Sequence, residues 1–127
     1  MGWTIEHSNA ARVAPILRVQ AEGSISTEEV LAQVMEGLEI IKQQQMVGAL
    51  VDYSKAILEM PLHEIYRLPD LFDAGELPRG TRIAVVLPAD PVNMHKYTFF
   101  DDVATNRGYQ VRLYWEPTQA LAWLADK

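Results

Sequence analysis

The fold is decided by residues 24–53, which read SISTEEVLAQVMEGLEIIKQQQMVGALVDY. Ser26 and Glu29 have the spacing of a capping box, in which the two residues satisfy each other's backbone amides at the start of a helix. Apolar residues then recur at helical spacing as far as Ile41. The nearly continuous apolar run over residues 47–53 is typical of a strand that is covered on both faces. A helix followed by an interior strand indicates an α/β fold.

The flanking sequence extends this unit on both sides. Polar and apolar residues alternate, as in half-buried strands, over residues 3–7, 17–21 and 109–115, and an apolar run covers 83–87. Proline is favoured in the first turn of a helix and marks the start of three further helices, at positions 61, 91 and 117. Pro69 is expected to kink or break the first of these three.

The predicted order of elements is therefore β-β-α-β-α-β-α-β-α. Right-handed crossovers between consecutive strands would give a mixed, mostly parallel sheet with a hairpin at one edge. We expect a single α/β domain over residues 1–127, with about five strands and four helices.

Composition excludes several classes of protein. The 127 residues include no cysteine, which excludes disulfide frameworks, cysteine-ligated metal sites and thiol catalysis. The net charge of −6 does not fit a nucleic-acid-binding surface, because a phosphate backbone would be repelled. The sequence begins without the features of a signal peptide, and its apolar runs are too short to span a membrane. We expect a cytoplasmic protein.

Catalytic signatures are missing from the sequence. It contains no glycine-rich phosphate-binding motif, no nucleophile elbow and no metalloprotease motif. The histidines at positions 7, 63 and 95 share no metal-ligand spacing. The sequence therefore predicts a protein that is not an enzyme and that holds neither a metal nor a cofactor.

Polar side chains follow the predicted parallel strands at the edge of the sheet where ligands collect in open α/β folds. These candidate partner-binding residues are Asp52, Tyr53, Ser54, Lys55, Asp90 and Glu116. The three carboxylates also have structural interpretations. Asp52 can accept a hydrogen bond from a loop, Asp90 can cap a helix, and Glu116 can interact with a helix dipole.

Two aromatic residues lie off the faces that the patterns assign to the core, Tyr114 on the polar face of its strand and Phe99 beside the inward-facing Phe100. Tyr66, Phe99 and Tyr114 are candidates for lining an apolar groove or a dimer interface. A homodimer therefore stays open as an arrangement of this chain.

Three long segments, together with the order of elements, resemble a known family. They read LVDYSKAILEMPLHEIYRLPDLF from residue 50, GTRIAVVLPAD from residue 80 and FFDDVATNRGYQVRLYWEPTQALAWL from residue 99. Over residues 3–125 the chain resembles the SpoIIAA-like branch of the STAS family. The resemblance implies a non-enzymatic regulatory or binding domain, similar to anti-sigma-factor antagonists, that acts by protein–protein interaction.

The resembling family also carries a phosphorylated serine, which has no counterpart in this sequence. The family pattern is D-[LF]-S-x-x-x-x-x-D-S-S-G. Asp52 and Ser54 match its opening, but its second aspartate and its serines fall on residues 60–62, which read MPL. No serine or threonine occurs between Lys55 and Gly80. We therefore expect protein binding without the phosphoserine switch.

Two alternative functions stay open. The topology is also similar to that of SEC14-type lipid-carrying domains, which implies an apolar small molecule held between helices and sheet. An enzyme that uses Asp52 or His63 would instead need a deep polar pocket at the carboxyl edge of the sheet. For a protein partner, the net charge of −6 favours a basic surface.

Overall fold

The computed structural model of the protein describes residues 2–8, 15–89 and 91–126, whose strands form one sheet in the order β1-β2-β3-β4-β5. β1 (Gly2–Ser8) runs antiparallel to β2 (Ile16–Ile25). β3 (Gly48–Leu58), β4 (Arg82–Val86) and β5 (Gln110–Tyr114) all run parallel to β2. The predicted mostly parallel sheet with a hairpin at one edge is confirmed.

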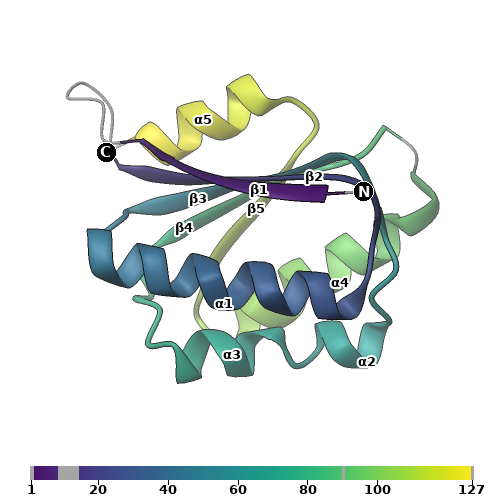
Figure 1. The fold of residues 1–127 in the computed structure, drawn as a ribbon, viewed down its shortest axis with the longest axis horizontal. Coiled ribbons are helices and arrows are strands. Elements are labelled where there is room, and N and C mark those ends of the chain that lie inside the picture. Colours follow the sequence, from purple (N-terminus) through teal and green to yellow (C-terminus); the bar gives the residue numbers. More distant parts are fainter. Residues whose placement is uncertain (1, 9–14, 90, 127) are drawn as a thin grey trace.

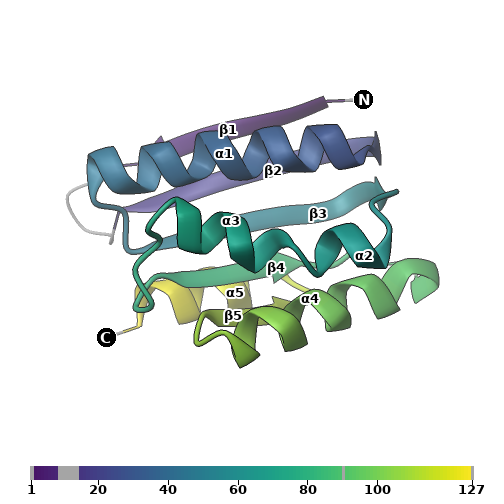
Figure 2. The same ribbon diagram turned by 90° about the horizontal axis from the view of Figure 1, so that it is seen from below.

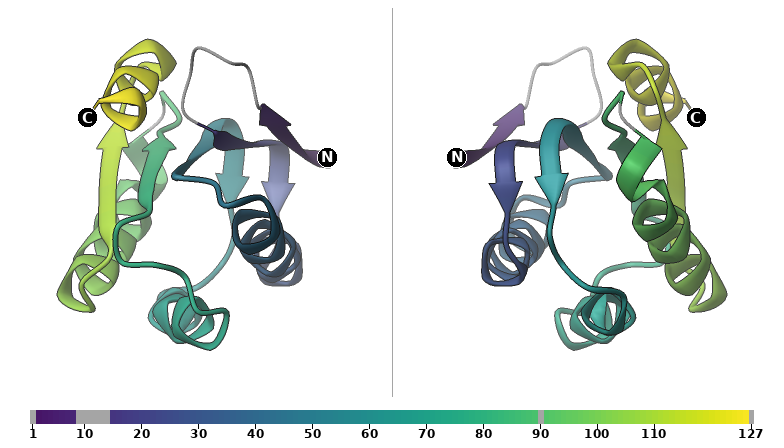
Figure 3. Two further views of the ribbon diagram at one scale, coloured as in Figure 1. Left: turned by 90° about the vertical axis from the view of Figure 1, so that its left-hand side faces the viewer. Right: turned by 90° about the vertical axis from the view of Figure 1, so that its right-hand side faces the viewer.

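The helices are distributed unequally over the two faces of the sheet. α1 (Thr27–Gln44), α2 (Leu62–Ile65), α3 (Leu68–Ala74) and α4 (Met94–Asn106) lie below the sheet in Figure 1, whereas α5 (Pro117–Ala125) lies above it. We name these two sides the four-helix face and the α5 face. Figure 2 views the four-helix face directly, and Figure 3 shows both layers from the ends of the molecule.

The strand order explains this distribution. Each connection from β2 to β5 moves to the next strand in the same direction across the sheet. Right-handed crossovers in one direction place every connecting helix on the same face. Among the helices of the described residues, α5 alone follows β5 and is not a crossover between strands, and it lies on the opposite face.

α1 begins as the sequence predicts. The Ser26 hydroxyl accepts a hydrogen bond from the Glu29 amide at 3.2 Å, and the Glu29 carboxylate accepts one from the Ser26 amide at 3.2 Å. This capping box satisfies two of the amides that a helix start leaves without partners.

Two helix boundaries differ from the predictions. The second predicted helix is split, because α2 ends at Ile65 and α3 begins at Leu68 with Pro69 in its first turn. The expected break is thus confirmed, since proline has no amide to continue the α-helical hydrogen bonds. The third predicted helix begins at Met94 rather than at proline 91, because a 3₁₀ turn, η1 (Pro91–Asn93), precedes it.

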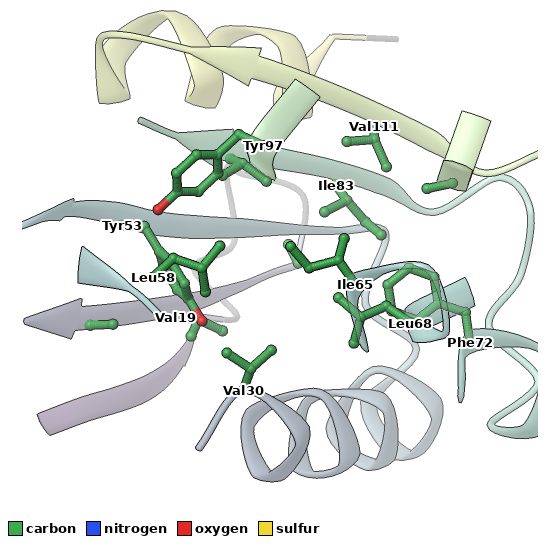
Figure 4. Packing of buried hydrophobic residues seen from close by; sticks show 14 of the residues in the cluster. Val19, Val30, Tyr53, Leu58, Ile65, Leu68, Phe72, Ile83, Tyr97 and Val111 are labelled. Atoms are coloured by element: carbon green, nitrogen blue, oxygen red, sulfur yellow. The ribbon is translucent and has the colours of Figure 1, made fainter. Parts of the chain in front are cut away.

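The protein has one hydrophobic core on each face of the sheet. The larger core fills the four-helix face and includes Val19, Ile65, Phe72 and Tyr97 (Figure 4). The smaller core lies under α5 and comprises Ile16, Leu50, Ala84, Val86, Ala120 and Leu124. Arg82 closes its edge by donating hydrogen bonds to the backbone oxygens of Trp123 and Asp126, at 2.6 and 2.8 Å.

Candidate functional site

β3 is longer than the sequence predicts. The expected strand covers residues 47–53, but β3 continues until the pair of Leu58 with Ile25, because β2 remains alongside it. β4 ends earlier, where Val86 pairs with Asp52. The prediction that Asp52 ends its strand is therefore wrong: Asp52 lies level with the end of β4, and β3 continues beyond it next to β2.

The extended part of β3 begins with a β-bulge. Gln20 of β2 pairs with Asp52, and Glu22 pairs with Lys55, so β3 has one residue more than β2 in this interval. Oδ1 of Asp52 accepts a hydrogen bond from the backbone amide of Ser54 at 3.0 Å and so holds the bulge in its shape. Lys55 is exposed. The bulge thus gathers three of the candidate residues on one strand.

Tyr53, the fourth candidate on this strand, points into the protein. Its side chain is 5% exposed and belongs to the core of the four-helix face. The hydroxyl group donates a hydrogen bond to Oε1 of Gln33 on α1. Burial raises the pKa of the Tyr53 hydroxyl, so this group stays protonated at neutral pH. Tyr53 therefore offers a partner no side-chain surface.

The other two candidates do not join the bulge. Glu116 is exposed at the start of α5, and its side chain makes no capping hydrogen bond. Val86 pairs with both Asp52 and Tyr114, so β5 lies two strand spacings, about 10 Å, from β3 at this level. Asp90 lies outside the described residues.

α2 follows the end of β3 and presents apolar side chains to solvent. Leu62 and Tyr66, one helical turn apart, are 40% and 62% exposed. The ring of Tyr66 stacks on Phe99 of α4, with centroids 6.4 Å apart and an angle of 28° between the planes. Two of the three aromatic candidates therefore lie together. The third, Tyr114, packs against Trp123 of α5, with ring centroids 6.2 Å apart.

A cavity of about 130 Å³ lies in the four-helix face. Its lining is almost wholly apolar and comes from α1, α2, α3, α4 and strands β2, β3 and β4. The polar residues in the lining are Gln33, Tyr53, Lys96 and Tyr97. Figure 4 shows the rings of Tyr53 and Tyr97 in this layer between sheet and helices.

Two polar atoms of this lining are buried without a hydrogen-bond partner. They are Nε2 of Gln33 and the hydroxyl oxygen of Tyr97, in side chains that are 5% and 4% exposed. Tyr53 contacts both residues, since it is bonded to Gln33 and its ring meets that of Tyr97 edge-on, with centroids 6.4 Å apart. Nζ of Lys96 already donates to the backbone oxygen of Leu58 at 3.0 Å.

The sequence analysis missed Gln33, although its position carries a signal. Gln33 lies in α1 between Val30 and Gly37, at the spacing of the buried face of the helix. A polar side chain at such a position must find a partner inside the protein or leave a group unsatisfied. The missing partner of its Nε2 atom cannot be read from the sequence, because it depends on how four helices pack.

A cluster of charges joins α3 to the end of α4. Asp73 accepts hydrogen bonds from Arg79 at 3.1 Å, from Arg107 and from the Tyr109 hydroxyl. The Tyr109 hydroxyl, together with the Arg107 guanidinium, holds the pKa of the Asp73 carboxyl below its usual value. Arg107 also contacts Asp70 at 3.0 Å. These groups satisfy one another within the chain, which indicates a structural role.

Within residues 2–8, 15–89 and 91–126, no three histidine, aspartate or glutamate side chains gather where they could hold a metal ion. His63 and His95 are both exposed. No helix in this described part is long and apolar enough to cross a membrane. The cavity is apolar and lies beneath the sheet, so it is unlike the deep polar pocket that the enzyme alternative needs.

No protein-family profile and no curated protein matches the sequence. The arrangement of strands and helices is nevertheless the SpoIIAA-like fold of STAS domains, as three solved structures show. An uncharacterized DUF3478-family protein from Shewanella loihica PV-4, with a SpoIIAA-like fold, matches with a TM-score of 0.61 and 18% identity. The match covers 97% of this chain and 93% of that chain.

The other two structures are of SpoIIAA itself. The Bacillus cell fate determinant SpoIIAA in its phosphorylated form has a TM-score of 0.52 and 10% identity, over 95% of this chain and 99% of that chain. The anti-sigma factor antagonist SpoIIAA in its unphosphorylated form has a TM-score of 0.50 and 12% identity, over 86% and 87%. The predicted fold class is confirmed; at these identities the similarity speaks for the fold alone.

Proposed function

We propose that the protein is a non-enzymatic regulatory domain that binds a protein partner through the bulge of β3 and the exposed side of α2. We name this the docking surface; it comprises Asp52, Ser54, Lys55, Leu62 and Tyr66. The observation that carries the proposal is the exposed Leu62–Tyr66 pair on α2, the next helix along the chain after β3 and its exposed Lys55. An aromatic anchor with a polar rim is typical of a protein-binding surface.

The docking surface works, in this proposal, without a phosphoserine. The segment that joins β3 to α2 contains Met60, which is fully buried, and Pro61, neither of which has a hydroxyl group. Partner binding would then depend on the amounts of the two proteins rather than on a kinase. We expect the protein to act in the bacterial cytoplasm, on a partner with a basic surface that complements the charge of −6.

The test compares two exposed side chains of similar accessibility. Tyr66, on the docking surface, is 62% exposed, and Met35, on α1, is 59% exposed. Wild type, Tyr66→Ala, Lys55→Glu and Met35→Ala would be immobilised and exposed to lysate of the source organism, and captured proteins quantified by mass spectrometry. We expect at least one protein that wild type and Met35→Ala retain equally and that the other two variants retain about tenfold less.

Two outcomes contradict the proposal. One is that Tyr66→Ala and Lys55→Glu, folded by circular dichroism, recover every captured protein as well as wild type does. The other is that wild type captures nothing above an empty matrix. A second copy of the chain counts as a partner if light scattering shows a dimer that Tyr66→Ala dissociates.

A further inference from the structure

We propose that the cavity in the four-helix face is a binding site for a small, mostly apolar molecule that carries a neutral hydrogen-bond acceptor, such as a carbonyl oxygen. The site is separate from the docking surface, since neither Leu62 nor Tyr66 lines it. The proposal therefore goes beyond protein binding and does not depend on it.

The size of the cavity sets the class of ligand. A volume of about 130 Å³ is close to that of engineered protein cavities of about 150 Å³, which bind benzene. The cavity therefore suits one ring with a short substituent. A lipid with long acyl chains does not fit this volume, so the ligand differs from the cargo of a lipid-carrying domain.

The chemistry of the two unpartnered atoms sets the polar group of the ligand. The Oε1 atom of Gln33 is occupied by the Tyr53 hydroxyl, and the free Nε2 atom is able only to donate. The Tyr97 hydroxyl is also free, and burial raises its pKa, so it keeps its proton. The Gln33 Nε2 atom therefore needs an acceptor, and the Tyr97 hydroxyl is able to donate to one as well. An apolar molecule, or an empty cavity, would leave both donors without a partner, which costs free energy.

The two unpartnered donors favour a neutral rather than an anionic acceptor. Lys96 also lines the cavity, and its ammonium group donates a hydrogen bond to the backbone oxygen of Leu58 at 3.0 Å. The other polar groups of the lining, those of Gln33, Tyr53 and Tyr97, are uncharged amide and hydroxyl groups. A carboxylate that accepts from Gln33 and Tyr97 would lose its hydration for hydrogen bonds from uncharged donors, which is unfavourable.

Two probes of nearly equal shape test the acceptor requirement. Acetophenone presents a carbonyl oxygen, and α-methylstyrene has a methylene group in its place. We would titrate each into the ¹⁵N-labelled full chain and follow the amide resonances of the cavity lining by NMR. We expect saturable shifts with acetophenone and at least tenfold weaker binding of α-methylstyrene.

Substitutions test whether the Tyr97 hydroxyl and the Gln33 amide cause the preference for acetophenone over α-methylstyrene. Tyr97→Phe removes a hydroxyl that has no partner in the protein, so it should fold normally and lose most of the preference for acetophenone. Gln33→Leu should reduce the preference further. Tyr66→Phe is the matched control, because it removes an exposed hydroxyl that does not line the cavity. This control should bind both probes as wild type does.

The proposal is overturned if neither probe shifts the lining resonances of the folded wild type. It is also overturned if both probes bind equally, or if Tyr97→Phe and Gln33→Leu keep the wild-type preference. Tyr66→Ala, which tests the docking surface, should leave acetophenone binding intact. The two proposals can therefore fail independently.

Discussion

The two faces of the sheet, although built on the same strands, are packed to different standards. Under α5, a nine-residue helix closes a small core in which Leu50 and Val86 are almost wholly inaccessible. On the four-helix face, more helices enclose a larger core, yet a cavity of about 130 Å³ remains, along with the unpartnered atoms of Gln33 and Tyr97. More covering elements have not produced tighter packing.

The space around two glycines illustrates this difference in packing. A Cβ atom on Gly48, which faces α5, would lie 2.8 Å from the Arg82 backbone oxygen and 2.9 Å from Cδ2 of Leu124. A Cβ atom on Gly37, in α1, would meet only Cδ2 of Leu17, at 3.3 Å. At Gly48 the α5 face has no room for a methyl group, whereas at Gly37 the four-helix face leaves space next to the cavity. The comparison suggests that one face serves stability and the other leaves space for binding.

Truncating one leucine on each face should give the largest effects. Leu50→Ala opens a void in the tightly packed core under α5, and we expect it to lower the free energy of unfolding by about 4 kcal/mol. Leu17→Ala enlarges a cavity that already exists, so fewer contacts are lost, and we expect about 2.5 kcal/mol. Urea denaturation of both variants measures the difference. Equal losses would contradict the claim that the faces are packed unequally.

The glycine pair should give effects of opposite sign. Gly48→Ala forces a methyl group against a backbone oxygen and should cost about 2 kcal/mol, because the strand or α5 must shift. Gly37→Ala should raise stability by about 0.5 kcal/mol, since alanine favours the helix and Leu17 is able to move toward the cavity. Thermal unfolding followed by circular dichroism is sufficient. A stabilised Gly48→Ala variant would refute the tight packing of α5.

The smallest effect on stability is expected for Asp73, in the charge cluster that joins α3 to the end of α4. The pKa of Asp73 is lowered in the folded protein, so its stabilisation is complete above the unfolded-state pKa, about 4, and is lost as the pH falls through the folded value. Asp73→Asn should therefore lower Tm at pH 7 and have progressively less effect toward pH 2. A Tm difference that does not change with pH would show that Asp73 acts through packing rather than charge.

Much of the fold is predictable because local signals agree with it. The capping box places the start of α1, and the apolar runs place the interior parts of β3 and β4. The length of β3 is not predictable in the same way. Ser54 and Lys55 have the composition of a strand end, but a bulge directs Lys55 outward while β2 continues the pairing to Leu58. A register with a distant strand decides this boundary.

The residues of the candidate sites also differ in whether a local sequence signal or a distant contact determines their position. Asp52, Ser54 and Lys55 are candidates from the sequence because polar residues after an apolar run are conspicuous, and their role in partner binding stays a prediction. Tyr53 is exposed or buried according to the face on which it falls, and here it faces the helices. Apart from the polar Gln33 on the buried face of α1, the cavity has no local signal, because a void arises from the fit of elements that are far apart in the sequence.

The position of α5 at the end of the element order affects how the protein folds during its synthesis. The ribosome makes all the strands before it makes α5, so the apolar side chains of Ile16, Leu50 and Val86 have no cover when the sheet first becomes able to form. Ala120 and Leu124 complete the layer only once they leave the ribosome. Until then the nascent chain exposes an apolar surface on this side of the sheet. A stalled or truncated chain that lacks α5 would keep this surface exposed and is expected to bind chaperones.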